Sequence, residues 1–188
     1  MKAFEVIKIG SKFLKENKIP SSILDSEILL SKTLNNTREE ILTNIEQKID
    51  KKKFLLFKKY LQRRSKNEPI AYILGEKEFW SSAFYVNNNT LIPRPETELL
   101  VDKLLEIYKN KNISILDIGT GSGCIIVSLL INLKSSIGFG VDISKDAISI
   151  ATKNSIKHEL ANRIKFSTLS FEKIFNKKFD LIVSNPPY

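Results

Sequence analysis

Two hydrogen-bond acceptors near the end of the sequence suit a reaction at a nitrogen that is a poor nucleophile. An apolar, strand-like run from Phe179 to Ser184 leads into Asn185, Pro186, Pro187 and Tyr188. The lone pair of an amide or ring-amine nitrogen is delocalised, so a methyl donor reaches it only when its N–H bonds are held and its plane is fixed. The Asn185 side-chain carbonyl and a backbone carbonyl beside rigid prolines are two such acceptors, and Tyr188 adds a flat face for stacking. A strand that ends in a Pro-Pro turn is the alternative interpretation.

A glycine-rich loop lies upstream, between an apolar run at 113–116 and a helix-like segment at 124–133. The loop reads Gly119-Thr120-Gly121-Ser122-Gly123, and Asp117 precedes it. Glycines at alternate positions let backbone N–H groups approach a ligand closely, and a helix N-terminus adds partial positive charge. A dinucleotide fingerprint has the spacing G-x-G-x-x-G, so the spacing found here disfavours NAD.

A second acid follows the loop at the distance expected of a nucleoside-binding site. The predicted strand 137–141 ends at Asp142, about 20 residues beyond the glycines, where a carboxylate can accept both ribose hydroxyls. The loop and its two acids suit S-adenosylmethionine, and no metal is implied. With Asn185 further along the chain, the order of motifs predicts methyl transfer to an amide or amino nitrogen.

The composition is typical of an intracellular globular protein. A chain of 188 residues with 42% hydrophobic content is long enough for one ordinary domain and a small one. One cysteine cannot form an internal disulfide. We find neither a signal-peptide apolar core nor a run of membrane-spanning length, so we expect a cytoplasmic protein without membrane contacts.

The positive charge is concentrated in the first third of the chain. Residues 1–68 hold 16 Lys and Arg against 9 Asp and Glu, whereas residues 69–188 hold 14 against 12. Clusters at 51–53, 58–59 and 63–64 could meet an acidic or nucleic-acid-bearing partner. A solvated helical face is the alternative, and neither interpretation makes the chain a primary nucleic-acid reader.

Apolar periodicity predicts helices in residues 1–68 and an extended pattern thereafter. Helices are expected at about 3–17, from Ser21 with Asp25 completing a capping box, from Thr37 with Glu40, and over 50–66. The last of these has an apolar side, which is expected to carry Phe54, Leu55, Phe57, Tyr60 and Leu61.

Beyond the helical part we expect a hairpin and then an α/β domain. Two extended stretches between Pro69 and Val86 predict a hairpin, within a linker at 69–92. A helix at 96–108 and then alternating strands and helices predict a doubly wound, mostly parallel sheet in a domain at 93–188.

The chain resembles the HemK/PrmC family over nearly its whole length. The resemblance rests on the glycine loop, Asp142 and the Asn185 motif, and on four further stretches: Glu68–Gly75, Phe79-Trp80, Ile92–Glu98 and Gly140–Ser144. Members of this family are class I, Rossmann-like methyltransferases that use S-adenosylmethionine. They modify the side-chain amide nitrogen of the glutamine in the Gly-Gly-Gln motif of peptide chain release factors. DNA or RNA amino methyltransferases share the Asn-Pro-Pro-Tyr motif and remain the alternative.

The resemblance implies a role for each motif residue. Gly119, Thr120, Gly121, Ser122 and Gly123 would wrap the methionine part of S-adenosylmethionine, Asp142 would hold the ribose, and Phe171 would stack near the adenine. Asn185 and the Pro186 carbonyl would accept the two amide N–H bonds of the substrate, with Pro187 beside them and Tyr188 packed on the amide. The resemblance further implies release factors as partners and a monomer; direct nucleic-acid binding is left open.

The sequence departs from the family pattern in two places. Ser170 stands where the family has an acid before an aromatic residue. Either Glu172 supplies the missing carboxylate near the adenine, or no residue does and the adenine contact is weaker. Family members also continue well beyond Tyr188. We therefore expect residues 179–184 to form an apolar edge, and the isolated chain to be poorly active or an inactive remnant that binds without turnover.

Overall fold

The computed structural model describes residues 1–174 and 177–186. The chain divides into two compact units, Met1–Leu74 and Gly75–Tyr188, which are taken one at a time below. The domain boundaries expected from the sequence, at 68–69 and 92–93, remain a proposal.

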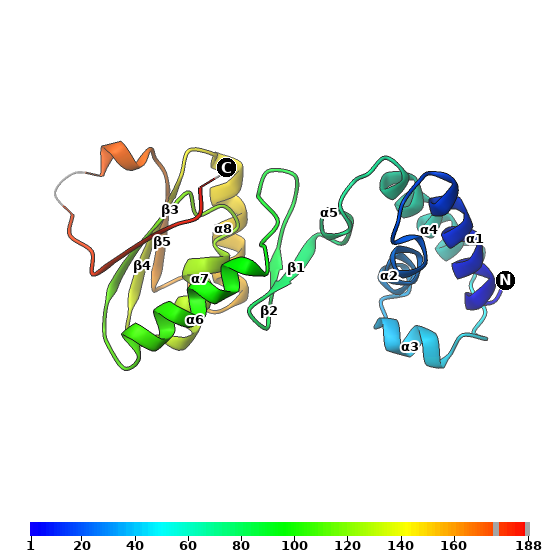
Figure 1. Cartoon of the computed structure of the whole chain (residues 1–188), viewed down its shortest axis with the longest axis horizontal. Coiled ribbons are helices and arrows are strands. Elements are labelled where there is room, and N and C mark those ends of the chain that lie inside the picture. Colours follow the sequence, from blue (N-terminus) through cyan, green and yellow to red (C-terminus); the bar gives the residue numbers. More distant parts are fainter. Residues whose placement is uncertain (175–176, 187–188) are drawn as a thin grey trace. The chain divides into compact units, whose positions relative to one another are not determined.

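The first unit is helical. Its helices are α1 (Ala3–Glu16), α2 (Ser22–Leu34), α3 (Arg38–Thr43), α4 (Lys51–Ser65) and α5 (Ile70–Leu74) (Figure 1). Helices α1, α2 and α4 pack against one another around buried apolar side chains, among them Leu14, Leu29 and Phe57. Gly10 allows this close approach, because a Cβ atom there would lie 2.6 Å from Cζ of Phe57. The predicted capping box of Thr37 and Glu40 begins α3.

Three local predictions for this unit are wrong. Residues 70–74 form α5 and not a strand, because Pro69 suits a first helical turn and its carbonyl accepts the Ile73 N–H at 3.2 Å. Asp25 completes no capping box; its carboxylate instead accepts a bond of 2.7 Å from Nε of Arg64. Leu55 is 51% exposed, because the helical period that buries Phe57 turns it toward solvent.

The second unit begins with a tight hairpin. Strands β1 (Glu76–Phe79) and β2 (Ser82–Tyr85) pair antiparallel, and the two turn residues, Trp80 and Ser81, both have positive φ angles, of 46° and 58°. Such angles are strained for residues other than glycine. Helix α6 (Glu96–Tyr108) stabilises the turn, since Glu98 accepts the Trp80 backbone N–H at 3.1 Å and Asp102 accepts its indole N–H at 2.6 Å.

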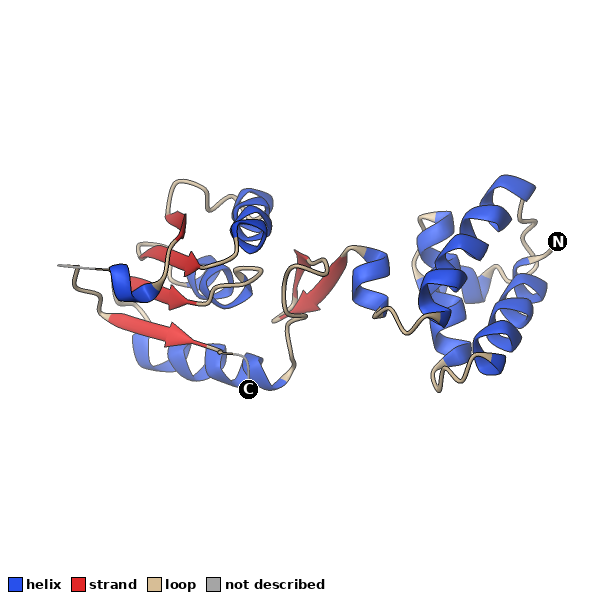
Figure 2. Ribbon diagram, turned by 90° about the horizontal axis from the view of Figure 1, so that it is seen from above, coloured by secondary structure: helices blue, strands red, loops and turns tan. Residues whose placement is uncertain are grey.

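A four-stranded parallel sheet forms the centre of the second unit (Figure 2). Its strands lie in the order β5-β4-β3-β6, and every neighbouring pair is parallel. The remaining elements are β3 (Ser114–Ile118), α7 (Cys124–Asn132), β4 (Ile137–Asp142), α8 (Lys145–Lys157), β5 (Ile164–Thr168), the 3-10 turn η1 (Phe171–Lys173) and β6 (Leu181–Ser184). This arrangement confirms the predicted α/β class I methyltransferase fold with a helical N-terminal part. Apolar side chains from α6, α7 and β3 fill the core.

Among residues 1–174 and 177–186, no helix is both long and apolar enough to cross a membrane. In the same described residues, no cluster of three or more His, Cys, Asp and Glu side chains is placed to bind a metal ion.

Candidate active site

The candidate site lies where the parallel strands of the second unit end. Ile118, Asp142 and Ser184 close β3, β4 and β6, and Leu169 follows β5. The carboxyl ends of neighbouring parallel strands share one edge of a sheet, which is where open α/β sheets bind ligands. All four residues line a hollow of about 390 Å³, within the usual range of about 300–1,000 Å³ for ligand pockets.

Several predicted site residues meet in this hollow. Its lining includes Gly119, Gly121, Asp142, Phe171, Asn185 and Pro186. Thr120 and Ser122 are buried and lie outside the lining, as does Gly123. Pro187 and Tyr188 lie outside the described residues. A segment that we had not proposed for the site, residues 89–91, completes the wall.

The three loop glycines hold a backbone shape that other residues rarely adopt. Gly119, Gly121 and Gly123 have φ angles of +69°, +56° and +78°. A Cβ atom on Gly119 would meet no described atom within 4 Å, so this part of the loop leaves room beside the backbone. At Gly123 the limit is lack of space, because an added Cβ atom would lie 3.2 Å from the Cβ atom of Ala151 on α8. Gly119 therefore faces open space and a Cβ atom on Gly121 would make one ordinary contact, at 3.9 Å from the Gly119 carbonyl oxygen, whereas Gly123 permits close packing.

Asp142 connects the glycine loop to the start of α8. One carboxylate oxygen accepts the Gly121 N–H at 3.0 Å, and the other accepts the Ser144 N–H at 2.9 Å. Each oxygen has a second acceptor position, so both could still accept a ligand hydroxyl. Asp142 is also the one charged residue among the described residues that line the hollow. The site is thus electronegative and suits a ligand with positive charge.

Asp117, the first of the two acids that the sequence associates with the loop, lies beneath it and is not among the described residues that line the hollow. It is 1% exposed; Oδ2 accepts a bond of 2.7 Å from the Thr120 hydroxyl, and Oδ1 has no hydrogen-bond partner among the described residues. Burial raises the pKa of this carboxyl to about 6; the Thr120 hydrogen bond and the Ile126 backbone N–H oppose the shift, and the charge of Asp142 adds a smaller contribution in the same direction as burial. The buried carboxylate oxygen without a described partner identifies Asp117 as a candidate functional residue, because such groups are rare in folded proteins.

Asn185 enters the site directly after β6. Its Nδ2 atom donates a hydrogen bond of 3.3 Å to the hydroxyl of Thr97, in the first turn of α6. Because the amide NH2 end is engaged by Thr97, the carbonyl end remains as an acceptor. Thr97 was not predicted as a site residue, although it belongs to the Ile92–Glu98 stretch of the family resemblance.

The segment after β5 supplies an aromatic face without an added charge. Phe171 is 57% exposed and lines the hollow, whereas neither Ser170 nor Glu172 is among its described lining residues. The sequence left open whether Glu172 supplies the carboxylate that Ser170 lacks. The described lining favours the alternative, in which no residue supplies it. The role of Phe171 remains a prediction.

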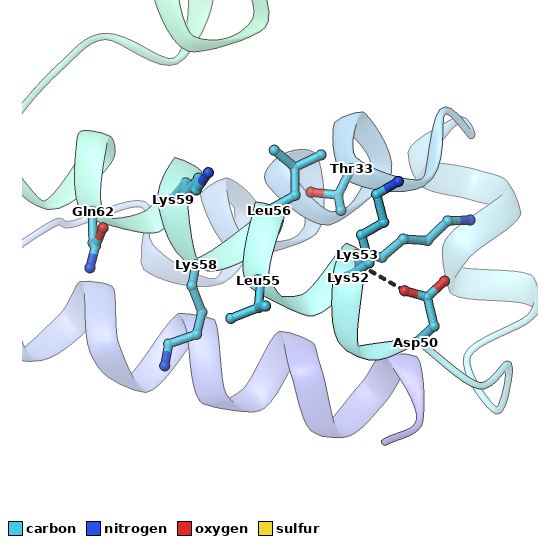
Figure 3. A pocket seen from close by; sticks show the side chains of 9 residues that line it. All are labelled: Thr33, Asp50, Lys52, Lys53, Leu55, Leu56, Lys58, Lys59 and Gln62. Carbon is cyan, nitrogen blue, oxygen red and sulfur yellow. Dashed lines mark hydrogen bonds between the residues drawn. The ribbon is translucent and has the colours of Figure 1, made fainter.

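A larger hollow, of about 800 Å³, lies on α4 in the first unit (Figure 3). Its lining is Thr33, Asp50, Lys52, Lys53, Leu55, Leu56, Lys58, Lys59 and Gln62. The one acid among them, Asp50, caps α4 by accepting the Lys53 backbone N–H at 2.7 Å. This basic, leucine-containing surface holds no general acid–base pair among its described residues, so it is not the candidate active site.

Comparisons with known proteins agree with both units. The profile of the PrmC N-terminal domain matches residues 5–75, and that of a methyltransferase domain matches residues 109–187. A release factor glutamine methyltransferase from Buchnera aphidicola subsp. Baizongia pistaciae is 43% identical, over all of this chain and 68% of its own length. One from Leptospira interrogans is 43% identical, over 97% of this chain and 66% of its own length.

Longer proteins also match. A bifunctional methyltransferase from Rickettsia bellii is 41% identical over 88% of this chain, which spans 35% of that protein. The chain thus spans between about one third and two thirds of the length of these relatives. The match to the Buchnera protein is high in identity and wide in coverage, and both unit profiles agree with it. The chain therefore belongs to the PrmC family of release factor glutamine methyltransferases.

Proposed function

We propose that this chain binds S-adenosylmethionine in the hollow at the carboxyl edge of the sheet and methylates the side-chain amide nitrogen of the glutamine in the Gly-Gly-Gln motif of peptide chain release factors. The observation that carries the proposal is that Asn185 and Pro186 line the same hollow as Gly119, Gly121 and Asp142. The groups suited to hold an amide and those suited to hold a nucleoside are therefore neighbours.

The residues present fit S-adenosylmethionine. Gly119 leaves room beside its backbone, Asp142 can accept the ribose hydroxyls, and Phe171 offers an exposed ring for the adenine. The negative charges of Asp142 and of ionised Asp117 favour a cation. When bound, S-adenosylmethionine would supply an electrophilic methyl group on a positively charged sulfur.

The remaining catalytic work is positioning. The Asn185 carbonyl oxygen accepts one N–H bond of the glutamine amide, and the Pro186 carbonyl accepts the other, so the amide plane is fixed and its nitrogen faces the methyl donor. Proline restricts the backbone here, which keeps the second acceptor in place. No strong base is required, because the amide nitrogen becomes acidic as the new bond forms. The roles proposed for Pro187 and Tyr188, beside and upon the amide, complete this arrangement.

The experiment is a methyl-transfer assay with three acceptors. Labelled S-adenosylmethionine is incubated with the protein and a release factor, the same factor with Gln→Ala in its Gly-Gly-Gln motif, or an adenine-containing oligonucleotide. We expect transfer to the first alone, and a loss of at least about 100-fold in kcat for Asn185→Ala with cofactor binding retained. Label on the oligonucleotide would favour nucleic-acid amino methylation. Cofactor binding without transfer would indicate the inactive remnant.

A further inference from the structure

Asn154 is a fully buried polar residue in the last turns of α8, outside the hollow. Its exposed fraction is 0%, so its amide must find partners within the protein. Oδ1 accepts the Tyr85 backbone N–H at 2.7 Å, while Nδ2 donates to the Tyr85 carbonyl at 3.0 Å and to the Ser122 carbonyl at 2.8 Å. Both N–H bonds and the carbonyl of this single side chain are therefore used.

The bonds to Tyr85 attach the hairpin to α8, which lies beside β2 (Figure 1). Tyr85 is the last residue of β2, and the Asn154 amide meets its N–H and C=O as a neighbouring strand would. The next residue, Val86, donates to the Gly75 carbonyl at 3.1 Å, and a turn at 87–90 follows. Residues 89 and 90 belong to this turn, and residues 89–91 form one wall of the hollow. Fixing Tyr85 thus fixes the start of this wall.

The bond to Ser122 holds the glycine loop, of which Gly119 and Gly121 line the hollow. Ser122 lies between Gly121 and Gly123, both of which have positive φ angles that glycine adopts without strain. Asp142 holds the Gly121 N–H from the side of the hollow, and Asn154 holds the Ser122 carbonyl from behind. The loop is therefore anchored at two successive residues from two different elements.

We propose that Asn154 is a positioning residue of the cofactor site, which sets the separation between the 89–91 wall and the glycine loop without touching the ligand. The identity of the ligand rests on the function proposed above, whereas the positioning itself does not. Loss of the Asn154 amide would remove the partner of the buried Ser122 carbonyl and of the half-buried N–H and carbonyl of Tyr85, and such losses are costly, most of all for the buried group. The effect is expected to be local, at Tyr85 and at residues 119–123.

The test combines hydrogen exchange with calorimetry on three variants. Asn154→Ala removes all three bonds. Asn154→Asp keeps an acceptor for the Tyr85 N–H but removes the N–H groups that donate to the Tyr85 and Ser122 carbonyls, so it leaves the bond to the Tyr85 N–H as the one that remains. The matched control is Ser155→Ala, which removes an equally buried polar group from the next position, where the hydroxyl bonds to Thr152 within the same helix at 2.8 Å.

We expect Asn154→Asp to speed exchange at residues 119–123 while the Tyr85 N–H stays protected, and to weaken S-adenosylmethionine binding by about 10-fold, the equivalent of one or two lost hydrogen bonds. Asn154→Ala should speed exchange at both places. Ser155→Ala should leave the affinity within about 2-fold and both places protected. Unchanged exchange in the Asn154 variants, or a loosened loop with unchanged affinity, would overturn the proposal.

If the variants do not fold, a measurement on the wild-type protein still tests the role of Asn154. In the wild type, the side-chain NH2 protons of Asn154 should exchange slowly, and added S-adenosylmethionine should slow them further together with the Tyr85 N–H. Rapid exchange of the Asn154 protons would refute the positioning role. If the wild type binds no S-adenosylmethionine, the proposed function fails, and exchange in the variants or the ligand-free protein still decides the role of Asn154.

Discussion

The substitution Asp117→Asn should change the stability of the second unit and its affinity for a cation in opposite directions. Asp117 is 1% exposed, and burial raises its pKa from 3.8 to about 6. A shift of about 2 pKa units corresponds to about 3 kcal/mol of preference for the neutral form in the folded protein. Ionised Asp117 therefore opposes folding, and asparagine removes that charge while keeping an acceptor for Thr120.

The sign of the pH dependence follows from the direction of the shift. Between about pH 4 and pH 6 the folded protein keeps the Asp117 proton while the unfolded chain has lost it, so wild-type stability falls as the pH rises. The variant lacks this proton. Its free energy of unfolding relative to the wild type should rise by about 2.4 kcal/mol from pH 4 to pH 7, whatever constant cost the new NH2 group adds.

Binding should change in the opposite direction. A cation above the loop favours ionised Asp117, so wild-type affinity for S-adenosylmethionine should increase with pH up to about 6 and then level off. Asp117→Asn should bind more weakly at pH 8 and lose this pH dependence. The measurements are urea unfolding at pH 4, 5, 6 and 7 and calorimetric titration at pH 5 and 8.

Ser128→Ala is the matched control, because the Ser128 hydroxyl is also buried and without a described partner but carries no charge. Its stability difference from the wild type should be independent of pH, and its affinity for S-adenosylmethionine should be unchanged. A pH-independent stability difference for Asp117→Asn, or wild-type affinity at pH 8, would refute the reasoning.

Three further predictions follow from single contacts. Thr97→Val should lower kcat by about 3- to 10-fold without changing cofactor affinity, because it frees the Asn185 amide to rotate. Thr97→Ser keeps the hydroxyl and should stay close to wild type, so equal activity of the two variants would contradict this role. Gly10→Ala should destabilise the first unit by about 1–3 kcal/mol, measured by urea unfolding, because the new Cβ atom would lie 2.6 Å from the Phe57 ring; a neutral effect would mean that the helices shift freely. Burial, aided by the charge of Lys157, lowers the pKa of His158, so wild-type stability should fall relative to His158→Gln as the pH drops below 6.5; a constant difference would rule out this titration.

Much of the fold could be predicted because local pattern and burial agree. The helix at 96–108 was expected with the bounds that the structure gives to α6, and the alternation of strands and helices after residue 112 predicted the parallel sheet. Residues 70–74 could not be assigned in this way. Their apolar side chains fit a short strand as well as a helical turn, and burial of Ile73 in the helical core decided between them.

The sequence by itself determined the kind of chemistry, since alternate glycines, a following acid and an Asn-Pro-Pro-Tyr motif each restrict the ligand through local geometry. Only the tertiary structure decided which of these residues share a hollow. It also decided which groups support them, because Asn154 meets Tyr85, 69 positions away, and Asn185 meets Thr97, 88 positions away. Contacts at such separations depend on how the elements pack, and a residue that acts through them shows no motif along the chain.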